Sequence, residues 1–136
     1  MNHHTKDKGD KGVGKVIADL LVKETHVCLP ISEHLPFDLI AVRKNGELLR
    51  VSVKYRAAVN GKIQVPFSSC YADSNGSHTK KVDKNLIDLM AIYCPDTDKV
   101  YYIKPTDFNG CVTLRIEKPK NNQTKNVYLA DHYLVP

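Results

Sequence analysis

The sequence lacks the features of a membrane or secreted protein. Its longest apolar stretches are far shorter than the roughly 18–20 residues that a transmembrane helix needs. The N-terminal residues do not lead into an apolar run with a cleavage site, so no secretory signal is expected. We therefore expect a cytoplasmic protein that has no membrane partner.

The cysteines do not form the pairs that structural zinc sites use. They are separated by 42, 24 and 17 positions, and no C-x-x-C pair occurs. In a reducing cytosol, cysteines with this spacing are expected to be free thiols. They are Cys28, Cys70, Cys94 and Cys111.

The amino-acid composition is that of one globular domain. The chain has 136 residues, of which 42% are hydrophobic and 26% are charged. This length fits a single domain over residues 1–136, and this balance rules out wholesale disorder. The sequence contains no internal repeat.

Basic residues are concentrated in one window. The formal net charge is +5, and residues 43–62 carry most of the excess of positive charge. Such a cluster is typical of a surface that binds a polyanion such as nucleic acid. The alternative is a solvated strand face on which lysines prevent edge-to-edge aggregation. The window contains Arg43, Lys44, Arg50, Lys54, Arg56 and Lys62, and Glu47 is its acidic residue.

One amphipathic helix is predicted near the N-terminus. Residues 1–12 are polar and contain glycine, and we expect them to form a loose, flexible arm. Apolar residues then recur at i, i+3, i+4, i+7 and i+8, which is the spacing of one helix face. This stripe consists of Val13, Val16, Ile17, Leu20 and Leu21.

The rest of the chain is rich in predicted strands. Residues 68–81 are predicted to be a long polar loop, and such a loop in a small domain is usually functional or mobile. Pro66 places its strand at a sheet edge, because proline cannot donate to a ladder. One helix followed by a run of strands indicates an α+β protein with a mixed sheet. The predicted strands are 25–31, 37–42, 49–56, 62–67, 86–94, 99–104 and 111–117, with a closing strand or short helix at 127–135.

Two charged residues interrupt the patterns of neighbouring strands. Asp38 lies in an apolar run, and Lys54 lies in a strand that alternates between apolar and polar residues. Partial burial of such groups is costly unless they pair or bind something. A carboxylate can hold a divalent cation that bridges to phosphate, and a lysine can orient the attacking water or stabilise phosphorane charge. The alternative is a structural ion pair or charges at a strand edge.

The turn between these strands decides whether the polar side chains share a face. A two-residue loop at 45–46 puts Asp38 on the opposite face from Ser52, whereas a three-residue loop at 44–46 puts Asp38 opposite Ser52. The longer loop needs its last residue in the left-handed region, and Gly46 supplies that residue. We therefore predict the three-residue loop.

The order and spacing of these motifs resemble the PD-(D/E)XK nuclease superfamily. Its short pattern corresponds to Pro36-Phe37-Asp38 followed by Ser52-Val53-Lys54, after an amphipathic helix. Further segments resemble the branch that contains the small group I intron homing endonucleases of bacteria, and the matches span nearly the whole chain. These segments are Gly9-Asp10-Lys11-Gly12 with residues 16–21, residues 37–40, 49–54 and 87–95, and the tail from Asn121-Asn122-Gln123 to residues 130–134.

The resemblance implies a restriction-endonuclease-like mixed β-sheet flanked by an N-terminal helix, with a β-rich second half. It implies a site-specific endonuclease that hydrolyses double-stranded DNA with Mg²⁺, which Mn²⁺ can replace. The match assigns Asp38 as the metal-binding carboxylate, Lys54 as the catalytic lysine and Ser52 to the second catalytic and metal position. The family's glutamate on the first helix falls at Val13, and Asp10 or Glu33 could compensate for its loss.

Seven further residues are candidates for DNA contact. Those that follow Lys54 can contact phosphates, and those in the polar loop combine aromatic, hydrogen-bonding and cationic groups that suit a groove or the backbone. The alternative for both groups is an ordinary solvated surface. The candidates are Arg56, Lys62, Gln64, Tyr71, His78, Lys80 and Lys81.

The partners implied are double-stranded DNA and further copies of the chain. One small subunit supplies one active site, so cutting both strands of a long target implies a homo-oligomer, either a dimer or a tetramer. Binding to DNA would associate this cytoplasmic protein with the nucleoid.

Other functions remain open at this stage. One is a Holliday junction resolvase or a phage DNA-processing nuclease of the same superfamily, which would cut branched rather than linear DNA. Another is a catalytically impaired DNA-binding protein on the same fold, which Val13 and Ser52 at acidic positions of the family favour. A basic structural protein without a nucleic-acid role is the third.

Overall fold

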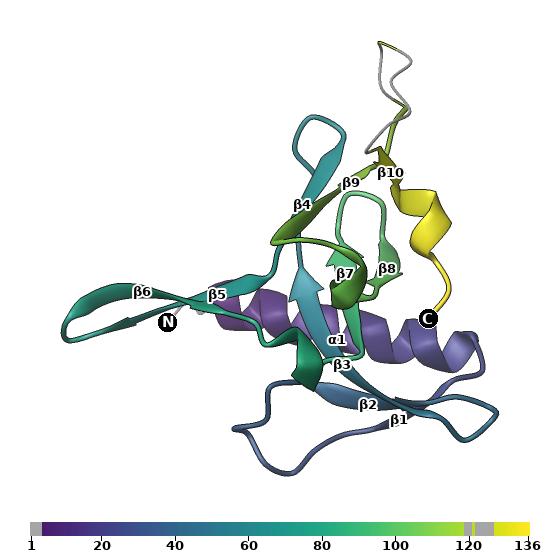
Figure 1. The fold of residues 1–136 in the computed structure, drawn as a ribbon. Coiled ribbons are helices and arrows are strands. Elements are labelled where there is room, and N and C mark those ends of the chain that lie inside the picture. Colours follow the sequence, from purple (N-terminus) through teal and green to yellow (C-terminus); the bar gives the residue numbers. More distant parts are fainter. Residues whose placement is uncertain (1–3, 119–120, 122–126) are drawn as a thin grey trace.

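A long helix and a five-stranded sheet form the centre of the molecule (Figure 1). The computed structural model describes residues 4–118, 121 and 127–136. The strands of the central sheet are β1 (His26–Cys28), β2 (Leu39–Val42), β3 (Leu48–Tyr55), β7 (Leu89–Cys94) and β8 (Lys99–Ile103). Their order is β1-β2-β3-β7-β8, in which β3 and β7 run parallel and the other neighbours run antiparallel. The prediction of an α+β fold with a mixed sheet is confirmed.

The helix α1 (His4–Val22) covers one face of the central sheet. Gly12, Val16 and Leu20 are buried at a spacing of four residues. Val16 and Leu20 pack with apolar side chains of β2, β3, β7 and β8 to form the first core of the molecule. Burial of this stripe is the main force that attaches the helix to the sheet.

The helix begins much earlier than the sequence predicts. The expected loose arm at residues 1–12 is wrong for residues 4–12, which belong to α1. Residues of opposite charge recur four positions apart in this segment, and such pairs stabilise a helix even without an apolar stripe. They are Lys6 with Asp10 and Asp7 with Lys11.

The turn between β2 and β3 has the predicted length and register. Leu39 pairs with Val51, which is the register of a three-residue loop. The backbone N–H of Arg43 donates to the oxygen of Glu47 at 2.9 Å, and the loop of residues 44–46 lies between them. Gly46 has a φ of 87°, in the left-handed region that the loop requires.

A second, smaller sheet packs on the face of the central sheet that α1 leaves uncovered. Its strands are β4 (Lys62–Pro66), β9 (Cys111–Arg115) and β10 (Tyr128–Leu129), in the order β10-β9-β4. Their apolar side chains form a second core with residues of β7 and β8. As Pro66 predicts, β4 is an edge strand. The described residues also form the short 3₁₀ helices η1 (Lys84–Leu86), η2 (Pro105–Asp107) and η3 (Ala130–Tyr133).

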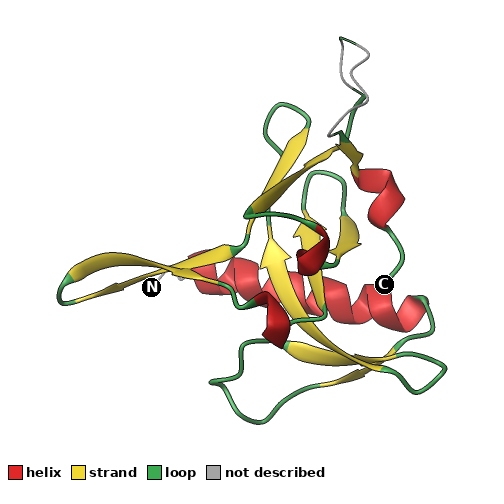
Figure 2. Cartoon of the chain, in the orientation of Figure 1, coloured by secondary structure: helices red, strands yellow, loops and turns green. Residues whose placement is uncertain are grey.

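Residues 68–81 form a β-hairpin and not the predicted loop. Its strands β5 (Ser68–Asp73) and β6 (Gly76–Lys81) pair antiparallel over six positions. The segment is mostly polar, so it lacks the apolar alternation by which strands are recognised in a sequence. Gly76, with a φ of 114°, makes the tight turn between the two strands possible. The hairpin projects away from the body of the molecule (Figures 1 and 2).

The hairpin is attached to the body at its base. Phe67 is 4% exposed and packs in the second core. Its backbone N–H donates to the oxygen of Gly110 at 3.1 Å, and the N–H of Val82 donates to the oxygen of Phe67 at 3.0 Å. An isolated two-stranded hairpin is only marginally stable in water, so this anchor at Phe67 holds the element in place.

The structure describes the side chains of three of the four cysteines. Among the residues whose side chains are described, Cys28, Cys94 and Cys111 are free thiols, and Cys94 is the buried one. The side chain of Cys70 is not among them. In the described part of the chain, no helix has the length and apolarity to cross a membrane.

We expect Gly14→Ala to stabilise the protein by about 0.5–1 kcal/mol, because glycine lowers the stability of a helix interior. Gly14 lies in the middle of α1, and a Cβ added there has no atom within 4 Å. Thermal unfolding followed by circular dichroism would show a higher Tm. The same change at Gly46, where φ is 87°, should lower the Tm. A lower Tm for Gly14→Ala would contradict this account of α1.

Candidate active site

The polar residues of β3 lie on the face of the sheet that α1 does not cover. Val51 and Val53 pack in the first core with α1. Since side chains alternate along a strand, Ser52 and Lys54 face the other way. Their partners in the parallel strand β7 are Met90 and Ile92, which belong to the second core.

Asp38 is held directly against β3. Its backbone N–H donates to the oxygen of Val51 at 2.9 Å. Its carboxylate Oδ2 accepts a hydrogen bond from the backbone N–H of Val53 at 2.6 Å. The carboxylate therefore contacts the backbone of β3 at Val53, between Ser52 and Lys54. These are the two residues that the sequence predicts to share a site with Asp38.

Lys54 is not neutralised by a neighbour. The lysine is half-buried and, among the described residues, makes no hydrogen bond or ion pair; Asp38 is exposed. The alternative of a structural ion pair between Asp38 and Lys54 is therefore not supported. Ser52 is 7% exposed, and its hydroxyl makes no hydrogen bond within the described part of the chain.

A second carboxylate on this face is already engaged. Asp88, at the start of β7, accepts from the Arg50 side chain through Nε at 3.0 Å and Nη2 at 3.1 Å. It also accepts from the backbone N–H of Arg50 at 2.7 Å. The side-chain hydrogen bond from Arg50 holds the pKa of Asp88 below its usual value. The pair fixes β3 against β7.

We expect Asp88→Asn to destabilise the protein by about 1 kcal/mol at neutral pH, because it weakens charge-assisted hydrogen bonds that are about one-third exposed. A depressed pKa stabilises the folded state above the ordinary pKa of an aspartate, about 3.9, and this contribution is lost as the pH falls further. Urea unfolding measures the free energy of unfolding of both proteins, and the difference between them should be smaller at pH 2.5 than at pH 7. Asp107→Asn, at an exposed aspartate, is the control; an undiminished difference at pH 2.5 would contradict the prediction.

The donor set suits a magnesium ion whose coordination the substrate completes. In the described ranges, no group of three or more His, Cys, Asp or Glu side chains could hold a metal ion. Val13 is half-buried on α1, while Asp10 and Glu33 are exposed and do not gather with Asp38 in such a group. If the predicted ligands Asp38 and Ser52 hold a metal ion, Asp38 would supply one carboxylate and Ser52 a weaker hydroxyl. Mg²⁺ is commonly bound by one or two carboxylates together with substrate phosphates and water, so this set fits it.

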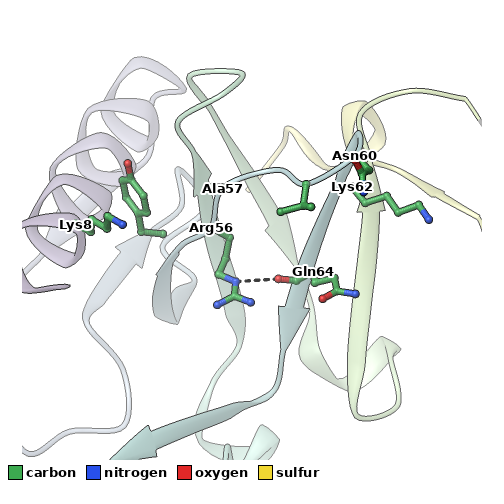
Figure 3. Close-up of a pocket in the computed structure, with 8 residues that line it drawn as sticks. Lys8, Arg56, Ala57, Asn60, Lys62 and Gln64 are labelled. Carbon is green, nitrogen blue, oxygen red and sulfur yellow. Dashed lines mark hydrogen bonds between the residues drawn. The ribbon is translucent and has the colours of Figure 1, made fainter. Parts of the chain in front are cut away.

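Three of the predicted DNA-binding residues come together in a hollow next to this site. Arg56, Lys62 and Gln64 line a cavity of about 540 Å³. The Nε of Arg56 donates to the backbone oxygen of Gln64 at 2.9 Å, which ties the end of β3 to β4 (Figure 3). Lys8 reaches the same hollow from α1. Lys8 is not among the residues predicted from the sequence, because residues 1–12 were expected to form an arm; the charge spacing of that segment was the available signal.

The other four candidates lie apart from this hollow, on the β5–β6 hairpin. Lys80 and Lys81 are exposed, and His78 is half-buried and opposite Tyr71 in the backbone register. The side chain of Tyr71 is not described. The structure therefore divides the predicted DNA contacts into a group next to Lys54 and a group on a projecting arm.

Comparison with known proteins identifies the class to which this fold and site belong. The family model for the PD-(D/E)XK endonuclease matches residues 3–136, and the chain belongs to this family. A solved structure of similar fold is that of a bacterial homing endonuclease, I-Ssp6803I. It aligns with a TM-score of 0.73 and 18% sequence identity, over 96% of this chain and 88% of that one. The fold is therefore restriction-endonuclease-like, as the resemblance implies. A search among curated proteins finds no sequence match.

Proposed function

We propose that this protein is a divalent-metal-dependent, site-specific endonuclease that cuts double-stranded DNA, as homing endonucleases do. The observation that carries the proposal is the hydrogen bond from Val53 to Asp38, which holds a carboxylate between Ser52 and Lys54. Family membership supports nuclease chemistry on this fold. The proposal assigns catalysis to Asp38, Ser52 and Lys54.

Each residue has a distinct part in the proposed hydrolysis. Asp38, with Ser52, would hold the metal ion, for which Mg²⁺ is proposed and Mn²⁺ as a substitute. The bound metal supplies Lewis-acid polarisation of the scissile phosphate. Lys54, which has no counter-ion in the described structure, would orient the attacking water and stabilise the negative charge that develops on the phosphate. The water oxygen bonds to phosphorus as the bond to O3′ breaks, which leaves a 5′-phosphate and a 3′-hydroxyl.

DNA contact is proposed for both groups of polar residues. Arg56, Lys62 and Gln64 would contact the backbone close to the cut. The β5–β6 hairpin, with Tyr71, His78, Lys80 and Lys81, would contact DNA farther away, since the major groove of DNA admits a two-stranded β-ribbon. A long DNA target could be contacted at both places, by the basic residues close to the cut and by the hairpin farther along the duplex.

The proposed assembly is a homo-oligomer. One chain contains one Asp38 and one Lys54, so cutting both strands at once needs at least two copies, and a dimer or a tetramer meets this need. The protein would act in the cytoplasm, on the nucleoid.

The direct test is incubation of the purified protein with plasmid and genomic-fragment DNA in Mg²⁺ or Mn²⁺. We expect discrete fragments with 5′-phosphate ends, and none in EDTA. Linear duplexes and four-way junctions tested side by side distinguish a homing-type enzyme from a junction resolvase. An absence of cutting with either metal on every substrate would overturn the nuclease proposal.

A DNA-binding protein with impaired catalysis is the second candidate, which Ser52 favours because a hydroxyl is a weaker metal ligand than a carboxylate. We expect Ser52→Asp to tighten Mn²⁺ binding about 10-fold or more, since it adds a second carboxylate beside Asp38. Isothermal titration in the presence of a duplex measures this. Thr113→Asp, which adds the same charge on β9, is the control. If Ser52→Asp cuts DNA and the unsubstituted protein does not, the second candidate is correct.

A further inference from the structure

The hollow beside the candidate active site is lined by positive charge. Lys8 from α1, Arg56 from the end of β3 and Lys62 from β4 line it, and its other lining residues are neutral. Figure 3 shows Lys8 on one side, Lys62 and Gln64 on the other, and Arg56 between them. Among the described residues, none of the three cations forms an ion pair with an acid. Two carboxylates lie behind the lining segment, because Asp96 accepts from the backbone N–H of Ala58 at 2.7 Å and Glu117 lies beside Gly61. The three lining cations outnumber these two acids, and a hollow with an excess of positive charge favours an anion.

The walls of this hollow are held in place by the fold. The guanidinium of Arg56 is fixed by its hydrogen bond to the backbone oxygen of Gln64. The backbone N–H of Arg56 donates to the backbone oxygen of Tyr93 at 2.9 Å. The ring of Tyr55, another lining residue, packs edge-on against Tyr93 with 5.6 Å between ring centroids. A site that is already formed loses little entropy when it binds a ligand.

Charged and polar groups link α1 to the strand that lies behind the ring of Tyr55. Asp98 accepts from the hydroxyl of Tyr93 at 2.7 Å and from Lys15 of α1 at 2.9 Å. The hydrogen bond from Lys15 holds the pKa of Asp98 below its usual value. This chain of contacts links α1, which carries Lys8, to the strand behind Tyr55.

We propose that this hollow is a phosphate pocket, in which Lys8, Arg56 and Lys62 hold a DNA backbone phosphate distinct from the one at Asp38 and Lys54. The inference rests on the proposed function, which it extends by adding Lys8. The pocket lies beyond Lys54, because Arg56 is two residues farther along the chain, or about 7 Å in an extended strand. None of Asp38, Ser52 and Lys54 lines it.

The first test compares two lysines of the same helix. Lys8→Gln and Lys11→Gln remove the same charge from exposed positions on α1, but Lys11 does not line the pocket. Binding of a 30-bp duplex of mixed sequence, labelled and in EDTA, is measured over a series of salt concentrations. One lost phosphate contact lowers the slope of log K against log salt by about 0.9, which weakens binding about eightfold at 0.1 M salt. We expect this loss for Lys8→Gln and a smaller change for Lys11→Gln. Equal slopes for the two variants would overturn the proposal.

The second test asks whether the phosphate is separate from the one at the active site. We expect Lys8→Gln to cause the same loss of slope in a Lys54→Ala background, because residues without a shared partner act additively. If Lys8→Gln has no effect in that background, the two lysines hold one phosphate and the proposal is wrong. Titration with inorganic phosphate, followed by NMR, should shift the amides of residues 60–62 in the unsubstituted protein and not in Arg56→Gln.

These outcomes are independent of cleavage. All of the binding measurements are made without metal. A protein that never cuts DNA but shows the expected difference in slope would retain the pocket and lose the nuclease proposal. A protein that cuts DNA and shows equal slopes would retain the nuclease proposal and lose the pocket.

Discussion

Replacing Lys54 with alanine is expected to slow DNA cleavage by about 10²–10³-fold, the usual effect of removing one group that stabilises transition-state charge. The ammonium group is half-buried, is unpaired in the described structure and lies next to the strand position that binds the Asp38 carboxylate. The other cation on β3 is Arg50, which is already paired with Asp88, so removal of Lys54 leaves no unpaired cation on that strand in the described structure. Single-turnover cleavage of a mapped target measures the loss.

The control for this variant is Lys104→Ala, which removes an exposed lysine that follows β8. We expect it to cut at an unchanged rate. Because Lys54 makes no bond within the described protein, Lys54→Ala should also keep its Tm within a few degrees. If Lys54→Ala cuts as fast as the unsubstituted protein, the assigned active site is wrong.

Replacing Asp38 with asparagine is expected to abolish metal-dependent cleavage, with a loss of about 10³-fold or more, because it removes the charged ligand of the site. The change is nearly isosteric, and the amide oxygen of asparagine can still accept the hydrogen bond from Val53. The fold is therefore retained while the charge is lost. Electron paramagnetic resonance of Mn²⁺ with duplex DNA should show loss of the bound ion.

Two further variants test whether another acid compensates for Val13. Asp10→Asn and Glu33→Gln remove carboxylates that, in the described part of the chain, form no group of three or more metal-ligating side chains with Asp38. We expect both to bind Mn²⁺ and cut DNA as the unsubstituted protein does. Retention of bound Mn²⁺ by Asp38→Asn, or its loss in Asp10→Asn, would show that the metal lies elsewhere.

The sequence predicts the central sheet well because two local rules act together there. Strict alternation in β3 separates Val51 and Val53 from Ser52 and Lys54, and a single glycine in the turn sets the register of the hairpin. These rules bring Asp38 to β3 without any knowledge of the tertiary fold. This part of the candidate site could be located from the sequence alone.

The elements that the sequence misplaces are those without an apolar pattern. The first turns of α1 and the β5–β6 hairpin are polar, so hydrophobic periodicity does not reveal them. Lys8 could not be predicted for this reason, because it reaches the hollow only if α1 begins at His4. The hydrogen bond between Arg50 and Asp88 joins residues that are 38 positions apart in the sequence. The two residues come together only because β3 pairs with β7 in parallel, and this pairing cannot be predicted from local sequence patterns.

The β5–β6 hairpin is attached to the body of the protein at two neighbouring residues. The chain leaves the body at Phe67 and returns at Val82, where the two residues are joined by one backbone hydrogen bond. The segment between them can change in length or composition without shifting the strands that carry Asp38 and Lys54. If the hairpin contacts DNA as proposed, a change in this segment would alter the preferred target, and a foreign ribbon grafted between Phe67 and Val82 would leave the strands that carry Asp38 and Lys54 in place.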